Sequence, residues 1–267
     1  MKSYIKFTLL TLMALQMSGC NLTAALGNGS HGQPVIEVGD KLISTTANSM
    51  INIDHTEWDT LLKKYVNEEG FVDYKGFLKD HDKLKAYLTK LSKTPPIKDW
   101  SVQELLAYYI NLYNAATVDL ILDNYPIKSI KDISRPWAKG FVNIGDKVVS
   151  LNAIEHGILR KMNEPRIHFA INCASFSCPK LMRDAFTAAK INEQLGKATV
   201  EFINGNQNDI SENNPKLSKI FDFYTSDFKV DGKADLTGYI NQYSSIKINP
   251  KAKYSFKDYD WSLNEQH

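Results

Sequence analysis

Cysteine is scarce in this chain, and neither sign of charge prevails. Three cysteines occur in 267 residues, and 32 basic residues are balanced by 30 acidic ones. No long basic run is present, so we expect no nucleic-acid partner, because polyanions are bound by concentrated positive surfaces. The sequence has no HExxH or paired CxxC motif. This absence argues against a metal site, and we expect no cofactor.

The first twenty residues, MKSYIKFTLLTLMALQMSGC, have the pattern of an export signal. Lys2 and Lys6 precede an apolar run that is too short to cross a bilayer as a helix. The run ends in MSGC, which resembles the bacterial lipobox, although Met17 stands where leucine is usual. The resemblance implies a signal peptide over residues 1–19 and lipidation of Cys20. An ordinary signal peptide is the alternative.

A lipidated Cys20 makes the membrane a partner of the protein, because attached acyl chains anchor it there. Asn21 follows the cysteine in place of aspartate. By resemblance to lipoprotein sorting in Gram-negative bacteria, this favours the outer membrane. We therefore expect a cell-envelope protein that faces the periplasm or the cell surface. Residues 20–55 are rich in Gly, Ser, Thr and Asn, which predicts a flexible tether.

Helical patterns dominate from residue 56 onward. Residues 56–66 carry one apolar stripe, as on an amphipathic helix. Residues 101–126 are apolar on nearly every side, which predicts a long, buried central helix. Ser101 and Glu104 have capping-box spacing at its start. No further segment has the pattern of a membrane span.

Strand patterns are few. Alternation around Gly145-Asp146 predicts a two-residue hairpin. RIHFAINC, residues 166–173, predicts a strand. CPKLMRDAF, residues 178–186, predicts a helix with Pro179 at its first position. We expect an α+β fold: a mostly helical single domain over residues 56–264, with a small antiparallel sheet.

Five segments carry a resemblance to a known family. They are YYINLYNAAT (108–117), SLNAIEHGILR (150–160), PRIHFAINCASFSCPKL (165–181), LSKIFDFYTSDF (217–228) and YDWSLN (259–264). In these segments the chain resembles the domain of unknown function 547 family, over about residues 58–264. That family occurs in bacterial, often secreted, proteins and in eukaryotic ones, including plant proteins with an added coiled-coil region. The resemblance implies a shared fold and important positions, but no reaction.

Cys173 and Cys178 remain once lipid has taken Cys20. In an oxidising compartment a disulfide between them is favoured, since five residues of separation can bring Cα atoms within the roughly 4.4–6.8 Å required. The alternative is a reactive thiol. Cys178 precedes the predicted helix, whose N-terminal partial charge favours the thiolate.

A thiol hydrolase needs a low-pKa cysteine, an imidazole and a group that orients the imidazole. The candidate catalytic residues are Cys178, Cys173, His156, His168 and Glu155. Asn172 is a second candidate for orienting an imidazole, and the candidate binding residues are Asn111, Asn114, Asn172 and Ser175.

Each of these residues also has a structural explanation. Asn152 and Glu155 have capping-box spacing, and His168 fits a satisfied core histidine. Asn111 and Asn114 lie within the central helix and need partners, which a neighbouring loop's backbone could supply. A metal site with His156, His168, Glu155 and a thiolate as ligands is a third alternative.

Two functions remain open from the sequence. One is a thiol-dependent hydrolase or acyl transferase that acts on peptide or amide bonds in the cell envelope, with peptidoglycan stems or proteins as substrates. The other is a non-catalytic envelope lipoprotein that binds a ligand or partner, its loop shaped by a Cys173–Cys178 disulfide.

Overall fold

The computed structural model describes residues 29–266, so the predicted signal peptide and Cys20 lie outside the described residues. The α-helices are α3 (Thr56–Tyr65), α4 (Tyr74–Phe77), α5 (His81–Lys93), α6 (Val102–Asn124), α7 (Ile191–Asn204), α8 (Lys219–Phe223) and α9 (Leu236–Tyr243). The strands are β1 (Val142–Ile144), β2 (Lys147–Val149), β3 (Lys216–Leu217), β4 (Lys229–Val230), β5 (Lys233–Ala234) and β6 (Ser255–Phe256). The shorter helices are η1 (Leu78–Asp80), η2 (Ile130–Asp132), η3 (Ala153–Ile158), η4 (Leu159–Met162), η5 (Pro165–Phe169) and η6 (Thr225–Asp227).

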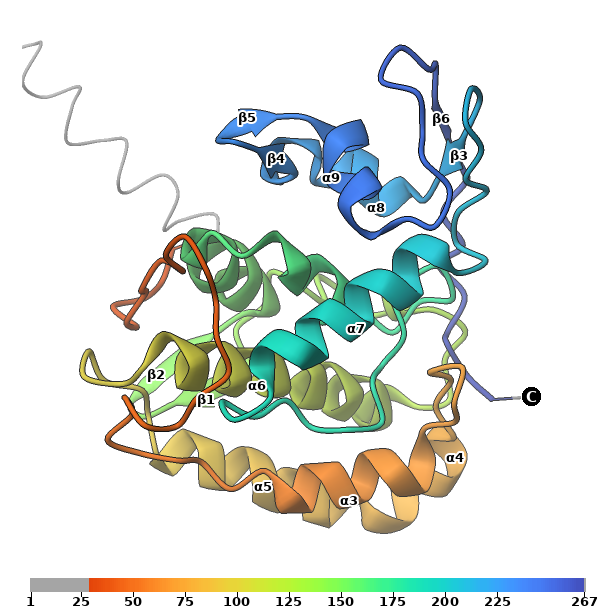
Figure 1. The fold of residues 1–267 in the computed structure, drawn as a ribbon. Helices are drawn as coiled ribbons and strands as arrows, with labels where there is room; N and C mark the ends of the chain where they lie inside the picture. The colour runs from red at the N-terminus through yellow and green to blue at the C-terminus, as the bar shows by residue number, and fades with distance from the viewer. Residues whose placement is uncertain (1–28, 267) are drawn as a thin grey trace, which may run out of the picture.

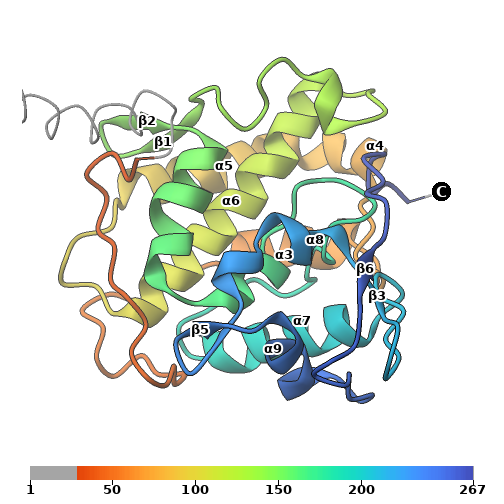
Figure 2. The same ribbon diagram turned by 90° about the horizontal axis from the view of Figure 1, so that it is seen from above.

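The helices are arranged in layers around α6 (Figures 1 and 2). Helices α3 and α5 form one outer layer, α6 packs on α5, and α7 lies on the opposite side of α6. Helices α8 and α9 form the outermost layer beyond α7, with the short strands β3 to β6 at its edges. The predicted α+β class is confirmed, with a small antiparallel sheet and a buried apolar helix.

The central helix α6 follows its sequence pattern. Leu105 to Leu112 are all buried, as are most residues beyond them. By length and composition α6 could cross a membrane, which the sequence analysis did not expect, but nearly all of that stretch is covered by the rest of the chain. The amide of Glu104 donates to the Ser101 hydroxyl, whereas the Glu104 carboxylate accepts from Ile53 instead of closing the predicted box.

The hairpin prediction is also confirmed. Strands β1 and β2 pair antiparallel, with Gly145 at φ +59° in the turn. Glycine suits this position because it enters the left-handed region without strain. Strands β4 and β5 form a second antiparallel pair, while β3 and β6 pair in parallel.

Two predicted elements around the cysteines are wrong. Residues 166–173 are not a strand: η5 ends at Phe169, and the chain then continues without regular structure. Residues 178–186 are not helical, so Cys178 does not lie at a helix N-terminus. An apolar alternation predicts a strand only where a neighbouring strand can accept its hydrogen bonds, and none lies here.

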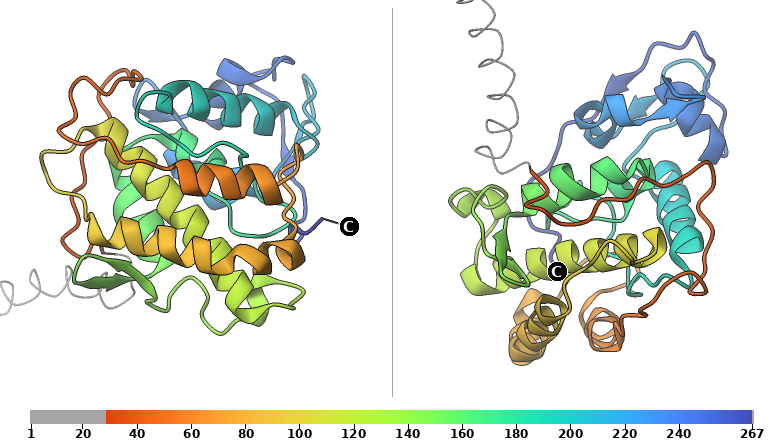
Figure 3. Two further views of the ribbon diagram at one scale, coloured as in Figure 1. Left: turned by 90° about the horizontal axis from the view of Figure 1, so that it is seen from below. Right: turned by 90° about the vertical axis from the view of Figure 1, so that its left-hand side faces the viewer.

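The described part of the predicted tether, residues 29–55, makes contacts with the helical body. The amide of Val38 donates to the carbonyl of Met162 at 2.7 Å, and that of Ile53 donates to the Glu104 carboxylate at 2.8 Å. These bonds fix the segment along the outside of the helices, where Figure 3 shows it in red and orange. Its polar composition reflects this surface path.

The hydrophobic core has two parts. The larger surrounds α6 and includes α3 and α5, and the smaller lies among α7, α8 and α9. After β6 the chain returns from the smaller part toward the larger one and ends beside α4 (Figures 1 and 3). This return path crosses the junction between the two parts of the core.

Asn111 and Asn114 bind loop backbone, as their structural explanation predicts. Asn111 donates to the carbonyl of Phe186 at 2.7 Å and accepts from the amide of the same residue at 3.0 Å. Asn114 donates to the carbonyl of Ala170 at 2.9 Å and accepts from the amide of Asn172 at 2.8 Å. Both side chains therefore fix irregular chain against the central helix.

Replacing Asn114 by alanine should destabilise the protein by about 2–4 kcal/mol, because two buried backbone groups lose their partners. Asn124→Ala is the matched control, since that exposed amide bonds only the Leu120 carbonyl of its own helix. We expect the control to change stability by less than about 0.5 kcal/mol. Urea unfolding of both variants measures the difference, and equal midpoints would contradict this role for Asn114.

Candidate functional site

The loop from Asn172 to Cys178, here called the thiol loop, is largely buried and irregular. It is held by the returning C-terminal segment: Phe176 donates its amide to the Ser262 carbonyl, and Asn264 donates its amide to the Ala174 carbonyl. Ala174 has φ +59°, an unfavourable value for a residue with a Cβ. Such strain persists only where the surroundings over-determine the conformation, and it is found preferentially at functional sites.

The two thiols of this loop are free and in contact. The Sγ atoms of Cys173 and Cys178 lie 2.8 Å apart, well beyond the roughly 2.05 Å of a disulfide. The disulfide favoured from the sequence is therefore not formed in this structure. The amide of Cys173 donates to the Cys178 sulfur at 2.9 Å, which orients the Cys178 thiol toward its neighbour.

The sulfur of Cys173 is surrounded by hydrogen-bonding groups. Besides Cys178, the hydroxyls of Ser175 and Tyr259 lie 3.1 and 3.3 Å from it. These hydrogen bonds, with that from Cys178 the strongest, lower the pKa of Cys173 against the effect of burial. Burial raises the pKa of Cys178 well above its usual value. Of the two thiols, Cys173 is therefore the one that loses its proton more readily.

Cys173 faces a pocket of about 200 Å³ between the two parts of the core. We call it the aromatic pocket. It is lined by Tyr113, Trp137, Asn152, Glu155, His156, Cys173, Ile220, Phe223, Tyr224, Tyr259 and Trp261. It thus brings together three of the catalytic residues predicted from the sequence: one thiol, one imidazole and one carboxylate.

Glu155 and His156 reach the pocket from η3, which is one turn of π-helix. Such turns are rare and often occur at functional sites. The carboxylate of Glu155 accepts from the hydroxyls of Tyr113 and Tyr224, so the capping-box explanation of this residue is wrong. Asn152, the N-cap of η3, makes no side-chain capping bond, and the Ser150 hydroxyl accepts from the amide of Ala153 instead.

The contact with Arg160 indicates which ring nitrogen of His156 carries the hydrogen. Arg160 lies 3.2 Å from Nδ1 of His156, and a guanidinium only donates, so Nδ1 accepts. In the neutral ring the hydrogen is then on Nε2. Glu155 lies 3.9 Å from Nδ1, too far to orient the ring by a hydrogen bond. His156 is therefore set up as a hydrogen-bond donor, and not as a base, in this state.

His168 lies outside the aromatic pocket. It is buried, stacks on Tyr224 at 4.0 Å between ring centroids, and bonds Asp227 through Nε2 at 2.9 Å. Burial lowers the pKa of His168. Asp227 also accepts two hydrogen bonds from Arg160. Although burial opposes its ionisation, these contacts hold the pKa of Asp227 well below its usual range. This network supports Tyr224 from behind. His168 is thus a core histidine, as its structural explanation predicts, but only its Nε2 is satisfied, because its buried Nδ1 has no hydrogen-bond partner.

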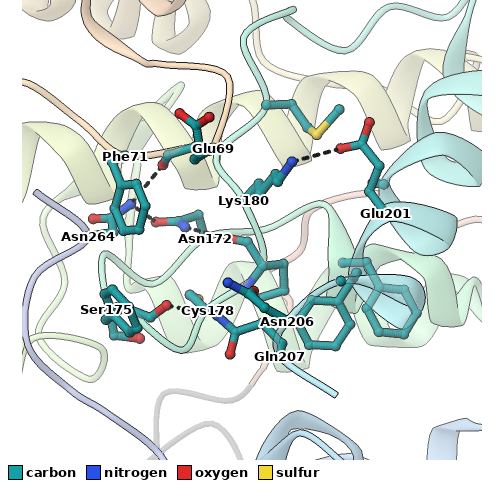
Figure 4. Close-up of a pocket in the computed structure, with 18 of the residues that line it drawn as sticks. Glu69, Phe71, Asn172, Ser175, Cys178, Lys180, Glu201, Asn206, Gln207 and Asn264 are labelled. Carbon is teal, nitrogen blue, oxygen red and sulfur yellow. Dashed lines mark hydrogen bonds and ion pairs between the residues drawn. The ribbon is translucent and has the colours of Figure 1, made fainter. Parts of the chain in front are cut away.

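Cys178 faces a different, larger pocket of about 470 Å³, shown in Figure 4. The predicted binding residues Asn172 and Ser175 line it, and Asn264 lies beside Asn172. The side chain of Asn172 donates to the Pro179 carbonyl and accepts from the Ala174 amide. Asn172 therefore shapes the thiol loop instead of orienting an imidazole. The thiol pair lies between the two pockets, with one sulfur lining each.

Most of the pocket wall consists of residues that were not predicted from the sequence. Tyr113, Tyr224, Tyr259 and Trp261 had no assigned role, although each lies within one of the five family-like segments. All five segments contribute side chains to the aromatic pocket, and Trp137 is the lining residue outside them. The signal was present in the segments, but only the fold brings them together.

Comparison with known proteins supports the resemblance over part of the chain. Residues 97–203 match the family model described as protein of unknown function, DUF547. The matched region contains α6, η3 and the thiol loop, but neither α8 nor the C-terminal segment. No curated protein and no solved structure matches the chain.

The thiol pair predicts a pH profile. Because Cys178 stabilises the thiolate of Cys173, Cys178→Ala should raise the pKa of Cys173 and move its alkylation by iodoacetamide to higher pH. At a pH below the pKa, each unit by which the pKa rises lowers the thiolate fraction tenfold. The accompanying gain in nucleophilicity of the thiolate is smaller than this loss. At neutral pH we expect alkylation about 3- to 10-fold slower. Mass spectrometry of the labelled peptide at a series of pH values measures the rate.

Cys178→Ser is the matched control, because it keeps a hydrogen-bond donor at the same position. Its profile should lie between those of the wild type and Cys178→Ala. If both variants alkylate at the wild-type rate across the series, Cys178 does not tune Cys173.

Proposed function

We propose that the protein is a cysteine-dependent acyl-transfer enzyme, a hydrolase or transferase that acts on amide or ester carbonyls in the cell envelope. The observation that carries this proposal is the position of Cys173. Its sulfur is surrounded by three hydrogen-bonding side chains and lines the pocket where all five family-like segments meet. A stabilised thiolate in a concave site is the nucleophile that such chemistry requires.

The first step is attack by the Cys173 thiolate on the substrate carbonyl carbon. A C–S bond forms, and the carbonyl oxygen becomes an oxyanion. Because the thiolate is already stabilised by its neighbours, no base is needed at this moment. The Tyr259 hydroxyl, 3.3 Å from the sulfur, and the Nε2–H of His156 are donors on the pocket lining that can stabilise the oxyanion.

The second step releases the leaving group and then the enzyme. Collapse of the oxyanion breaks the bond to the leaving nitrogen or oxygen, which takes a proton from water, and leaves a thioester on Cys173. Water, or an acceptor amine in a transferase, attacks this thioester and loses one proton, which neutralises the hydroxide left when the leaving group was protonated. The C–S bond breaks and the thiolate of Cys173 is restored, again stabilised by the hydrogen bond from the Cys178 thiol.

A binding role without covalent chemistry is the second candidate. One observation favours it: among residues 29–266 no imidazole forms a hydrogen bond with either sulfur. The thiols are unbonded in this structure, and the pocket would serve either function. The two candidates differ in whether Cys173 becomes acylated.

Acylation of Cys173 tests the enzyme. With p-nitrophenyl acetate we expect an acetyl group on Cys173 by peptide mass spectrometry, with release of nitrophenol. Cys173→Ala should lose both signals. If wild-type protein releases nitrophenol no faster than Cys173→Ala and carries no acetyl on Cys173, the binding role is correct.

A matched pair of variants tests His156 as a donor. His156→Ala removes an oxyanion donor and should lower kcat by about 10²-fold, whereas His156→Gln keeps an N–H and should retain activity within about tenfold of wild type. Equal loss in both variants would instead assign His156 as an acid or base. The kcat for ester turnover measures each.

We also propose that the protein is anchored in the membrane through a lipid on Cys20, with the domain facing the periplasm or the cell surface. The lipobox-like MSGC sequence supports this. Cells grown with an alkyne-tagged fatty acid should incorporate the tag into the wild type and not into Cys20→Ala. Equal tagging of both proteins would contradict lipidation at this cysteine.

A further inference from the structure

The aromatic pocket has a composition that the acyl-transfer chemistry does not require. Six aromatic side chains line it, together with one carboxylate. The aromatic side chains are those of Tyr113, Trp137, Phe223, Tyr224, Tyr259 and Trp261. Aromatic faces carry negative partial charge, and enclosures of several rings are used to bind organic cations.

The rings are inclined to one another and form concave walls. Trp137 and Trp261 have centroids 5.6 Å apart at 65°, and Tyr259 lies 4.4 Å from Trp261 at 48°. Phe223 continues the wall at 5.5 Å from Tyr259 and 49°. A single flat platform, of the kind on which a planar ligand stacks, would have parallel rings. Inclined rings instead can enclose one small group from several sides.

Two of these rings already contact cations. The ammonium of Lys131 lies 5.3 Å from the Trp261 ring centroid, and the guanidinium of Arg160 lies 5.4 Å from that of Tyr224. The charge of Arg160 is balanced by its two hydrogen bonds to Asp227. Neither Lys131 nor Arg160 lines the pocket, so no lysine or arginine is among its lining residues.

Glu155 places a carboxyl group in this pocket. It is only 5% exposed, and within the described part of the chain no lysine or arginine forms an ion pair with it. The hydroxyls of Tyr113 and Tyr224 use one acceptor position on each oxygen, and a carboxylate has about four. The basic side chain that pairs with Glu155 is His156, whose Nδ1 lies 3.9 Å from the carboxylate, beyond hydrogen-bond distance. Burying a carboxylate is costly, and a cation bound against it would offset that cost.

We infer that the aromatic pocket binds an alkylammonium group, and that the substrate is a carbonyl compound carrying such a group. That this compound is a substrate rests on the proposed function, whereas binding of the ammonium group does not. A volume of about 200 Å³ lies below the range of pockets that take a whole drug-sized ligand, so a small head group fits. The cation would lie among the rings, with Glu155 as its counter-ion.

Calorimetric titration of the Cys173→Ala protein tests binding without catalysis. The probes are choline, butylamine, and the neutral carbon isostere of choline in which a tert-butyl group replaces trimethylammonium. We expect choline or butylamine to bind about tenfold more tightly than the isostere. Whichever of choline and butylamine binds more tightly shows whether the pocket prefers a quaternary ammonium or a lysine-like primary amine.

Two variants identify the groups responsible. Glu155→Gln, which keeps the shape of the side chain, should weaken cation binding about tenfold and leave the isostere unchanged. Trp261→Leu should also weaken cation binding. Tyr254→Leu is the control, because Tyr254 is exposed and lies outside the pocket. Equal affinity for cation and isostere, or an unchanged cation affinity in Glu155→Gln, would overturn the inference.

The outcomes separate this inference from the proposed function. Cation binding without acylation of wild-type Cys173 would reject the enzyme and keep the binding site. Acylation without preference for a cation would keep the enzyme and reject the ammonium site. Circular dichroism of each variant shows whether a loss of binding comes from loss of the fold.

Discussion

The burial of an irregular loop is the constraint on which the rest of this structure depends. The thiol loop has no helix or strand of its own, yet most of its peptide groups are removed from water. Buried amides and carbonyls must find partners, and here they come from far along the chain. Asn114 of α6 binds the loop where it begins, and residues 260–264 bind it as the chain returns.

These partners also fix the chemistry. Because Ala174 is held in a strained conformation, the chain turns sharply enough to bring Cys173 and Cys178 into contact. The two thiols then differ: hydrogen-bond donors lower the pKa of Cys173, whereas burial raises the pKa of Cys178. The same returning segment supplies Tyr259 and Trp261, so the strand-like pairing that holds the loop also builds the pocket wall.

The pocket combines a thiolate with a carboxylate, which is unfavourable without compensation. Glu155 raises the pKa of Cys173, opposing the effect of its hydrogen-bond donors. An ammonium group bound between the aromatic rings would reduce this repulsion. The proposed cation site would thus also favour the thiolate form of the proposed nucleophile, because a bound cation stabilises a nearby anion.

The sequence by itself determined the α+β class, the buried helix α6, the amphipathic α3 and the hairpin at Gly145. These depend on hydrophobic period and turn chemistry, which are local. It also identified Cys173, Glu155 and His156 as candidates, because their residue types carry chemistry.

The tertiary structure alone decided the rest. Residues 166–173 and 178–186 were predicted as a strand and a helix, but buried partners from α6 and the C-terminus override their local preference. Whether the thiols are bonded, and which imidazole shares a pocket with Cys173, depend on distances between segments remote in sequence. Side-chain period reports which face of an element is buried, and not which residues it meets there.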